Sequence, residues 1–233
     1  MKNVKTINAF PTLIQSFDLN EGNHCADLIN FLKKQKTIQI NVIDKGVNTF
    51  NHDLLREPEL ENLRTKIKSA INVYAQTAGI QFPLVITNSW ANVLKKGGKV
   101  KIHSHRVSVI SGAFYPTASS EVGSICFKNP VSVYHQLYGG DQNIQDPDTE
   151  NPFDPYSDVH YLQWYMKIKP TPGLLILFPS WLEHWTTENK SNERITLSFN
   201  TNYKPYIPKE LNIKLNANIT GEVMKRKEFN DHS

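Results

Sequence analysis

The sequence has few cysteines and no long hydrophobic run. Its two cysteines, Cys25 and Cys126, are too few for a disulfide framework and fit a reducing compartment. No segment approaches the roughly 20 consecutive apolar residues of a transmembrane helix. Residues 1–19 lack the continuous apolar stretch of a signal peptide. We therefore expect a cytoplasmic protein that does not span a membrane.

A strong excess of either charge is also missing. The 26 Lys and Arg residues nearly balance the 22 Asp and Glu residues, which leaves a formal charge of +4. This balance permits an anionic ligand but does not indicate nucleic acid as a partner. With 39% hydrophobic residues among 233, the composition fits a single globular domain over 1–233.

Helical patterns occupy the first third of the chain, residues 1–80. One helix is predicted over 57–79, because apolar residues recur there at three- and four-residue steps. Pro58 fits its first turn, and Gly79 fits its C-terminal cap. A second helix is expected over 20–35.

The pattern changes after residue 80 to short, alternating segments rich in β-branched and aromatic residues. Helices followed by strands indicate an α+β protein, whose β part we place at 81–203 as a sandwich or barrel. An acidic, turn-rich insertion over 134–159 and a weakly patterned tail over 204–233 complete the chain. The expected strands are 84–94, 99–117, 123–129, 161–170, 173–180 and 194–203.

Three histidines suggest a metal centre. His103 and His105 are two residues apart in a predicted strand, so both should point to the same face. An isolated pair of this kind more often lies on a solvated face, but Val109 and Ala113 share its parity and indicate an interior face. With His184 from a distant strand, three ligands could bind a metal and leave its other positions open.

Arg194 opens the last predicted strand and points to an anionic ligand. An inward-facing guanidinium keeps its charge and therefore needs an anionic partner. Thr196 shares its parity, and a guanidinium beside a hydroxyl can hold a carboxylate. A small acid that also chelates the metal would satisfy both features, and 2-oxoglutarate is such an acid.

Two other classes stay open at this point. A three-histidine zinc hydrolase or lyase, or an iron dioxygenase that does not use 2-oxoglutarate, would also use these histidines, but it leaves Arg194 and Thr196 without a role. A non-catalytic ligand-binding jelly roll would make the histidines incidental.

The segments "NVLKKGGKVKIHSH" and "H…RITLSFN" resemble the 2-oxoglutarate/Fe(II)-dependent dioxygenases. The motifs "WAN", "SG-x-x-Y" and "FPSWL-x-H" are similar to those of uncharacterised phage and bacterial members. This resemblance implies a double-stranded β-helix, a jelly-roll or cupin-like barrel, with the N-terminal helices packed on one sheet. It also implies Fe(II), 2-oxoglutarate and O2, and hydroxylation of a small molecule, a protein side chain or a nucleobase. A phage-encoded member would act in the host cytoplasm.

Residue roles follow from the same resemblance. His103 and His184 match the iron ligands, and Arg194 matches the arginine that binds the far carboxylate of the cosubstrate. Asn92, Thr196 and Tyr115 match polar cosubstrate contacts. The sequence departs from the family at His105, where a carboxylate is usual, and at Asn200, where nucleic-acid demethylases have a second arginine. We predict that His105 is the third metal ligand.

Overall fold

The computed structural model describes residues 11–19, 24–105, 107–116, 118–131 and 165–204. The predicted insertion over 134–159 and the tail beyond Lys204 lie outside these residues. The described elements confirm the α+β prediction. They are β1 (Gln15–Asp18), α1 (His24–Lys33), β2 (Thr37–Ile38), β3 (Ile43–Thr49), the 3-10 turns η1 (Leu54–Arg56) and η2 (Pro58–Leu60), α2 (Glu61–Thr77), β4 (Leu84–Val100), β5 (Ile110–Phe114), β6 (Ile125–Lys128), β7 (Tyr165–Ile168), β8 (Leu174–Pro179), β9 (His184–Thr186) and β10 (Glu193–Tyr203).

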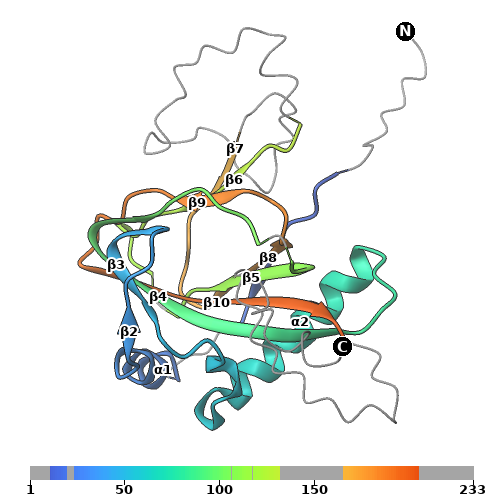
Figure 1. Cartoon of the computed structure of the whole chain (residues 1–233), viewed down its shortest axis with the longest axis horizontal. Coiled ribbons are helices and arrows are strands. Elements are labelled where there is room, and N and C mark those ends of the chain that lie inside the picture. Colours follow the sequence, from blue (N-terminus) through green and yellow to red (C-terminus); the bar gives the residue numbers. More distant parts are fainter. Residues whose placement is uncertain (1–10, 20–23, 106, 117, 132–164, 205–233) are drawn as a thin grey trace, which may run out of the picture.

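The strands form two antiparallel sheets. The larger sheet has the order β1-β8-β5-β10-β4-β3-β2, and the smaller sheet has the order β7-β6-β9. Figure 1 shows the smaller sheet lying over one face of the larger one. Side chains from both sheets share one buried cluster, so the space between the sheets is part of the interior. Its members are Ala113, Tyr115, Ile125, Phe127, Ile168, Leu174, Ile176, Phe178 and Leu182.

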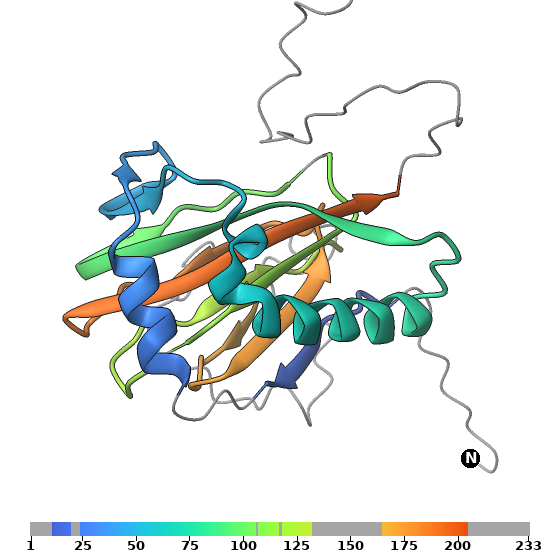
Figure 2. The same ribbon diagram turned by 90° about the horizontal axis from the view of Figure 1, so that it is seen from below.

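The helices cover the opposite face of the larger sheet, as predicted. Figure 2 shows α1 and α2 lying against this face. The apolar stripe of α2, which includes the buried residues Ile67 and Ile71, packs in one cluster with Phe114, Leu197 and Phe199 of the sheet. Gly79 follows α2 with φ of 71°, a left-handed conformation that glycine adopts without strain. The helices therefore bury one face of the sheet and leave the other face for the site.

The first third of the chain contains more strand than the sequence indicates. Besides α1 and α2, it supplies β1, β2 and β3, which are the outer strands of the larger sheet. β3 is irregular, because its register with β4 shifts between Asp44 and Gly46, and Lys45 has φ of 48°. A bulge of this kind breaks the alternation by which strands are recognised in a sequence.

The prediction of one strand over 99–117 is wrong in its middle. β4 ends at Val100 and β5 begins at Ile110, so the two histidines lie in a connection between strands. This connection bonds to two separate segments: His103 exchanges backbone hydrogen bonds with His184, and the His105 N–H donates to the carbonyl of Ser180. Val107, two residues after His105 and of the same parity, is 53% exposed, so the interior face predicted from this parity does not extend to it.

Candidate active site

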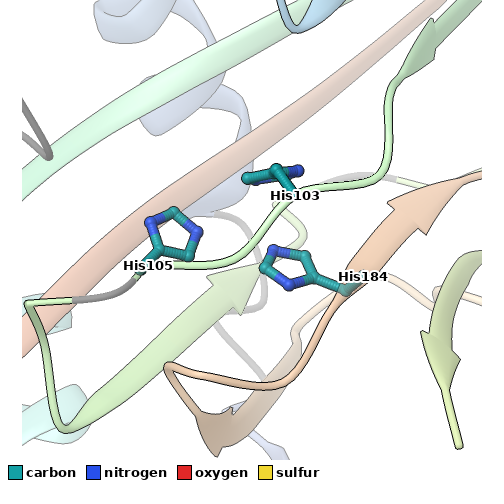
Figure 3. Close-up of side chains that lie close together, drawn as sticks. All are labelled: His103, His105 and His184. Atoms are coloured by element: carbon teal, nitrogen blue, oxygen red, sulfur yellow. The ribbon is translucent and has the colours of Figure 1, made fainter. Parts of the chain in front are cut away.

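Three histidines converge at one point between the two sheets. His103 lies in the connection after β4, His184 begins β9, and their N–H and carbonyl groups pair at 3.0 and 2.9 Å. The ring centroids are 4.3 Å apart for His103 and His184, and 5.1 and 5.2 Å apart for each of these with His105. One nitrogen from each ring lies within 4.8 Å of the others, which is a spacing that could hold a metal ion. Figure 3 shows the three rings facing one another.

Backbone carbonyls orient two of these rings. His103 Nδ1 lies 2.8 Å from the carbonyl oxygen of Lys101, and His184 Nδ1 lies 2.9 Å from that of Leu182. Since a carbonyl oxygen only accepts, each Nδ1 carries the proton and donates it. The Nε2 atom of each ring then keeps its lone pair, which is the arrangement that metal-binding histidines use.

All three imidazoles are neutral near neutral pH. Burial, followed by the neighbouring His103, lowers the pKa of His105 to about 3. Burial, followed by the other two histidines, holds the pKa of His184 well below 6.5. Burial also lowers the pKa of His103, although its two backbone hydrogen bonds oppose the shift. Neutral imidazole is the form that binds a metal, so little proton competition is expected.

No carboxylate joins the histidines among the described residues that line the cavity. Glu183, the neighbour of His184 in sequence, points outward and pairs with Lys128 Nζ at 2.6 Å. His105 instead stacks on His184, with 18° between the ring planes, and its ring centroid is 5.8 Å from that of Trp90. The group is therefore an all-histidine set within the described chain.

Arg194 is the charged residue of the cavity, and its side chain is buried. It is 2% exposed, its Nε donates to the carbonyl of Gly123 at 3.2 Å, and an Nη donates to the Tyr115 hydroxyl at 3.4 Å. Burial lowers the pKa of Arg194 and raises the pKa of Tyr115. No described carboxylate forms an ion pair with Arg194. A buried guanidinium without a counter-ion favours binding of an anion.

The neighbours of Arg194 on β10 support the same conclusion. Thr196 follows on the same face and is 3% exposed, and no group in the described part of the chain forms a hydrogen bond with its buried Oγ1. Asn92 lies directly opposite Thr196 on β4 and also lines the cavity. An orphaned hydroxyl beside an unpaired guanidinium fits the carboxylate of a small acid, because each would gain a charge-assisted hydrogen bond.

The structure thus brings the seven predicted site residues into one cavity of about 200 Å³. It also adds residues that the sequence analysis did not select. Asn48 and His52 come from β3 and the segment after it, and Trp90 comes from β4. Only the pairing of β3 with β4 brings Asn48 and His52 to the cavity, so no local pattern could identify them. Asn200, at the position where nucleic-acid demethylases have a second arginine, accepts a hydrogen bond of 2.7 Å from the Ser111 hydroxyl through its Oδ1.

A known protein family matches the central part of the chain. Residues 88–200 match the family described as "Putative 2OG-Fe(II) oxygenase", and this range contains the seven predicted site residues. Over this range the chain is similar to the 2-oxoglutarate/Fe(II)-dependent oxygenases. This match, together with the fold, indicates an oxidoreductase that uses Fe(II), 2-oxoglutarate and O2. Among curated protein sequences, none matches this chain significantly.

Several solved structures share the fold. HygX from Streptomyces hygroscopicus, solved with nickel and 2-oxoglutarate bound, is 12% identical with a TM-score of 0.55 and coverage of 83% of this chain and 84% of its own. A prolyl-4-hydroxylase from Pseudomonas putida is 9% identical, with a TM-score of 0.55 and coverage of 83% and 94%. The epimerase SnoN from nogalamycin biosynthesis is 10% identical, with a TM-score of 0.57 and coverage of 83% and 81%. These similarities confirm the predicted double-stranded β-helix.

The membrane prediction was tested separately on the helices. Neither α1 nor α2, the two α-helices of the described residues, combines the length and the apolar character that crossing a bilayer requires.

Proposed function

We propose that this oxygenase is a dioxygenase that hydroxylates a C–H bond of its substrate. In the overall reaction, one oxygen atom of O2 enters the substrate as a hydroxyl group, and the other enters succinate as 2-oxoglutarate loses CO2. His103, His105 and His184 are the proposed metal ligands. Arg194 and Thr196, with Tyr115 and Asn92, are proposed to bind 2-oxoglutarate.

The observation that carries this proposal is the state of two buried polar side chains of β10, Arg194 and Thr196. Among the described residues, no carboxylate pairs with the buried Arg194, and the buried Thr196 Oγ1 has no hydrogen-bond partner. Both line the cavity that contains the three histidines. A ligand with one carboxylate for Arg194 and a second oxygen pair for the metal satisfies all of these groups together, and 2-oxoglutarate has this form.

The metal centre is proposed from the chemistry of its donors. Three neutral imidazoles suit Fe(II), and ligands on one side leave other positions open for the cosubstrate and O2. The iron, when bound, supplies the activation of O2 that protein side chains cannot provide. The carbonyls of Lys101 and Leu182 hold the His103 and His184 rings in the metal-binding tautomer.

The other residues bind and orient the cosubstrate. Tyr115 lies under the guanidinium of Arg194, 5.1 Å from ring centroid to carbon, and accepts one of its N–H groups. With the Gly123 carbonyl, this contact fixes the guanidinium plane before a ligand arrives. A preorganised, dry cation strengthens the ion pair with a carboxylate and fixes the position of the cosubstrate relative to the metal.

A binding assay without O2 and a turnover assay with O2 test the proposal. Protein loaded with Mn(II) should bind 2-oxoglutarate in calorimetry, and protein loaded with Fe(II) should release succinate from 2-oxoglutarate in the presence of O2. Zinc-loaded protein serves as a control that should bind 2-oxoglutarate without forming succinate. Tight metal binding without any affinity for 2-oxoglutarate would instead support a three-histidine enzyme of another class.

A further inference from the structure

A second asparagine contacts Asn92 inside the cavity. Asn48 on β3 is the cross-strand partner of Asn92 on β4, and both residues line the cavity. Asn48 is 2% exposed, and its Nδ2 donates to Asn92 Oδ1 at 3.0 Å. A buried side-chain amide with a partner in this position determines how the neighbouring amide is turned.

This contact fixes which group of Asn92 is left for a ligand. An amide offers an acceptor oxygen and a donor NH2 group, and the oxygen of Asn92 is already occupied by Asn48. The NH2 group is therefore the one that remains. Directly across the strand pair, the unpartnered Thr196 Oγ1 offers a second donor. Two donors side by side on neighbouring strands of the same cavity wall suit a ligand with several oxygen acceptors.

His52 holds Asn48 in turn. Its Nε2 lies 3.2 Å from Asn48 Oδ1, and because an amide oxygen only accepts, Nε2 carries the proton. Burial lowers the pKa of His52, although a backbone hydrogen bond to Thr49 and the charge of Asp53 oppose the shift, so the ring is neutral near neutral pH. The ring also packs near Trp90, with centroids 6.0 Å apart. The three side chains form one hydrogen-bonded row from His52 through Asn48 to Asn92.

We propose that Asn48, held by His52, is a positioning residue that turns the NH2 group of Asn92 toward an oxygen of bound 2-oxoglutarate. The inference rests on the proposed function, because it requires 2-oxoglutarate in this cavity. Asn48 itself does not touch the cosubstrate. It acts by preventing the Asn92 amide from presenting its oxygen, which would repel an anionic ligand.

A double-mutant cycle tests the positioning role of Asn48. Asn48→Leu, which is nearly the same size, should weaken 2-oxoglutarate binding to Mn(II)-loaded protein by roughly tenfold, the worth of one hydrogen bond to a charged group. The same substitution in an Asn92→Ala background should have little further effect, because the amide to be positioned is gone. Affinity for Mn(II) should be the same in all four proteins.

The role of His52 is tested by two substitutions, of which one keeps a hydrogen-bond donor toward Asn48 and the other removes it. His52→Gln can still donate to Asn48 and should keep the wild-type affinity for 2-oxoglutarate, whereas His52→Leu should weaken it. Equal affinity in the Leu and Gln variants would overturn the role of His52.

Two outcomes for Asn48 separate the inference from the proposed function. If Asn48→Leu binds 2-oxoglutarate as well as wild type, or loses affinity equally in the Asn92→Ala background, Asn48 is only structural and the inference is wrong. If wild-type protein binds Mn(II) but not 2-oxoglutarate, the proposed function fails, and the inference fails with it.

Discussion

At the residue scale, the proposed role of His105 as a metal ligand in place of a carboxylate has measurable consequences. Three neutral imidazoles leave a divalent site at +2, whereas the more common pair of histidines with one carboxylate leaves it at +1. His105→Ala should therefore lose most of its iron affinity, because one of three ligands is removed. His105→Asp should keep iron and at least part of the succinate formation. Iron binding by equilibrium dialysis and succinate release measure both effects.

The competing assignment makes His105 a neighbour of the metal rather than a ligand. His105 stacks on His184, and this contact alone could explain its position. Under that assignment, His105→Ala would keep the iron affinity and activity of wild type. His103→Ala provides the reference for a lost ligand in the same assay.

Arg194 should contribute to cosubstrate binding and little to metal binding. Removing a desolvated partner of a charge pair costs about 2–5 kcal/mol, which corresponds to a loss of affinity of roughly 30-fold or more. Arg194→Ala should show this loss for 2-oxoglutarate at unchanged Mn(II) affinity. The 2-oxoglutarate affinity of Arg194→Lys should lie between that of wild type and that of Arg194→Ala, because lysine keeps the charge but not the planar guanidinium group.

Arg56, whose side chain is 59% exposed and lies outside the cavity, is the matched control. Arg56→Ala should bind 2-oxoglutarate like wild type. Equal affinities of the Arg194→Ala variant and wild type would show that the carboxylate binds elsewhere.

Most candidate site residues could be predicted from the sequence, because the chemistry of their side chains and their alternation along a strand indicate where they point. Arg194 and Thr196 alternate on a regular strand, and both line the cavity as expected. His105 was placed on the correct side for a wrong reason, since it lies in a connection whose direction depends on bonds to His184 and Ser180. Asn48 was missed because its partner is 44 residues away in the chain.

At the element scale, α2 should contribute to stability through its buried stripe. Ile67 is 0% exposed and packs against the larger sheet, so Ile67→Ala should lower the free energy of unfolding by about 2–5 kcal/mol. Val73 lies on the same helix but is 48% exposed. Val73→Ala should change the free energy by less than about 1 kcal/mol. Urea unfolding of both variants measures the difference, and similar losses would contradict the packing of this face.

The success of sequence prediction differs between elements for physical reasons. β8 and β10 are buried along most of their length, so their composition predicts them well. β1 and β2 have four and two residues, which is too short for a pattern. They are stabilised by pairing with β8 and β3, and such pairing partners cannot be deduced from local sequence.

At the scale of the whole molecule, the two faces of the larger sheet have different functions. The helices cover one face with apolar side chains, while the other face presents polar residues of β4 and β10 to the cavity. The smaller sheet closes this cavity from the other side and contributes His184. Polar groups that would be costly in a core are thus gathered where a ligand satisfies them.

The burial of the three histidines should make the stability of the metal-free protein sensitive to acid. Burial holds the pKa of His105 at about 3 in the folded state, against 6.5 for an unperturbed histidine. Below about pH 6.5 the unfolded chain therefore takes up a proton that the folded chain does not, so stability falls as the pH drops from there toward 3. His103 and His184 shift in the same direction and add to the effect.

Thermal unfolding of metal-free protein at about pH 7.5 and about pH 5 measures this contribution. The midpoint temperature should be lower at the acidic pH, and the decrease should be smaller in His105→Gln, because the variant has no imidazole to protonate at this position. Titrating groups away from the three histidines contribute equally to both proteins, so their effect cancels in the comparison. The same decrease in wild type and variant would show that His105 titrates normally in the folded chain, and therefore that it is not buried among the other two histidines.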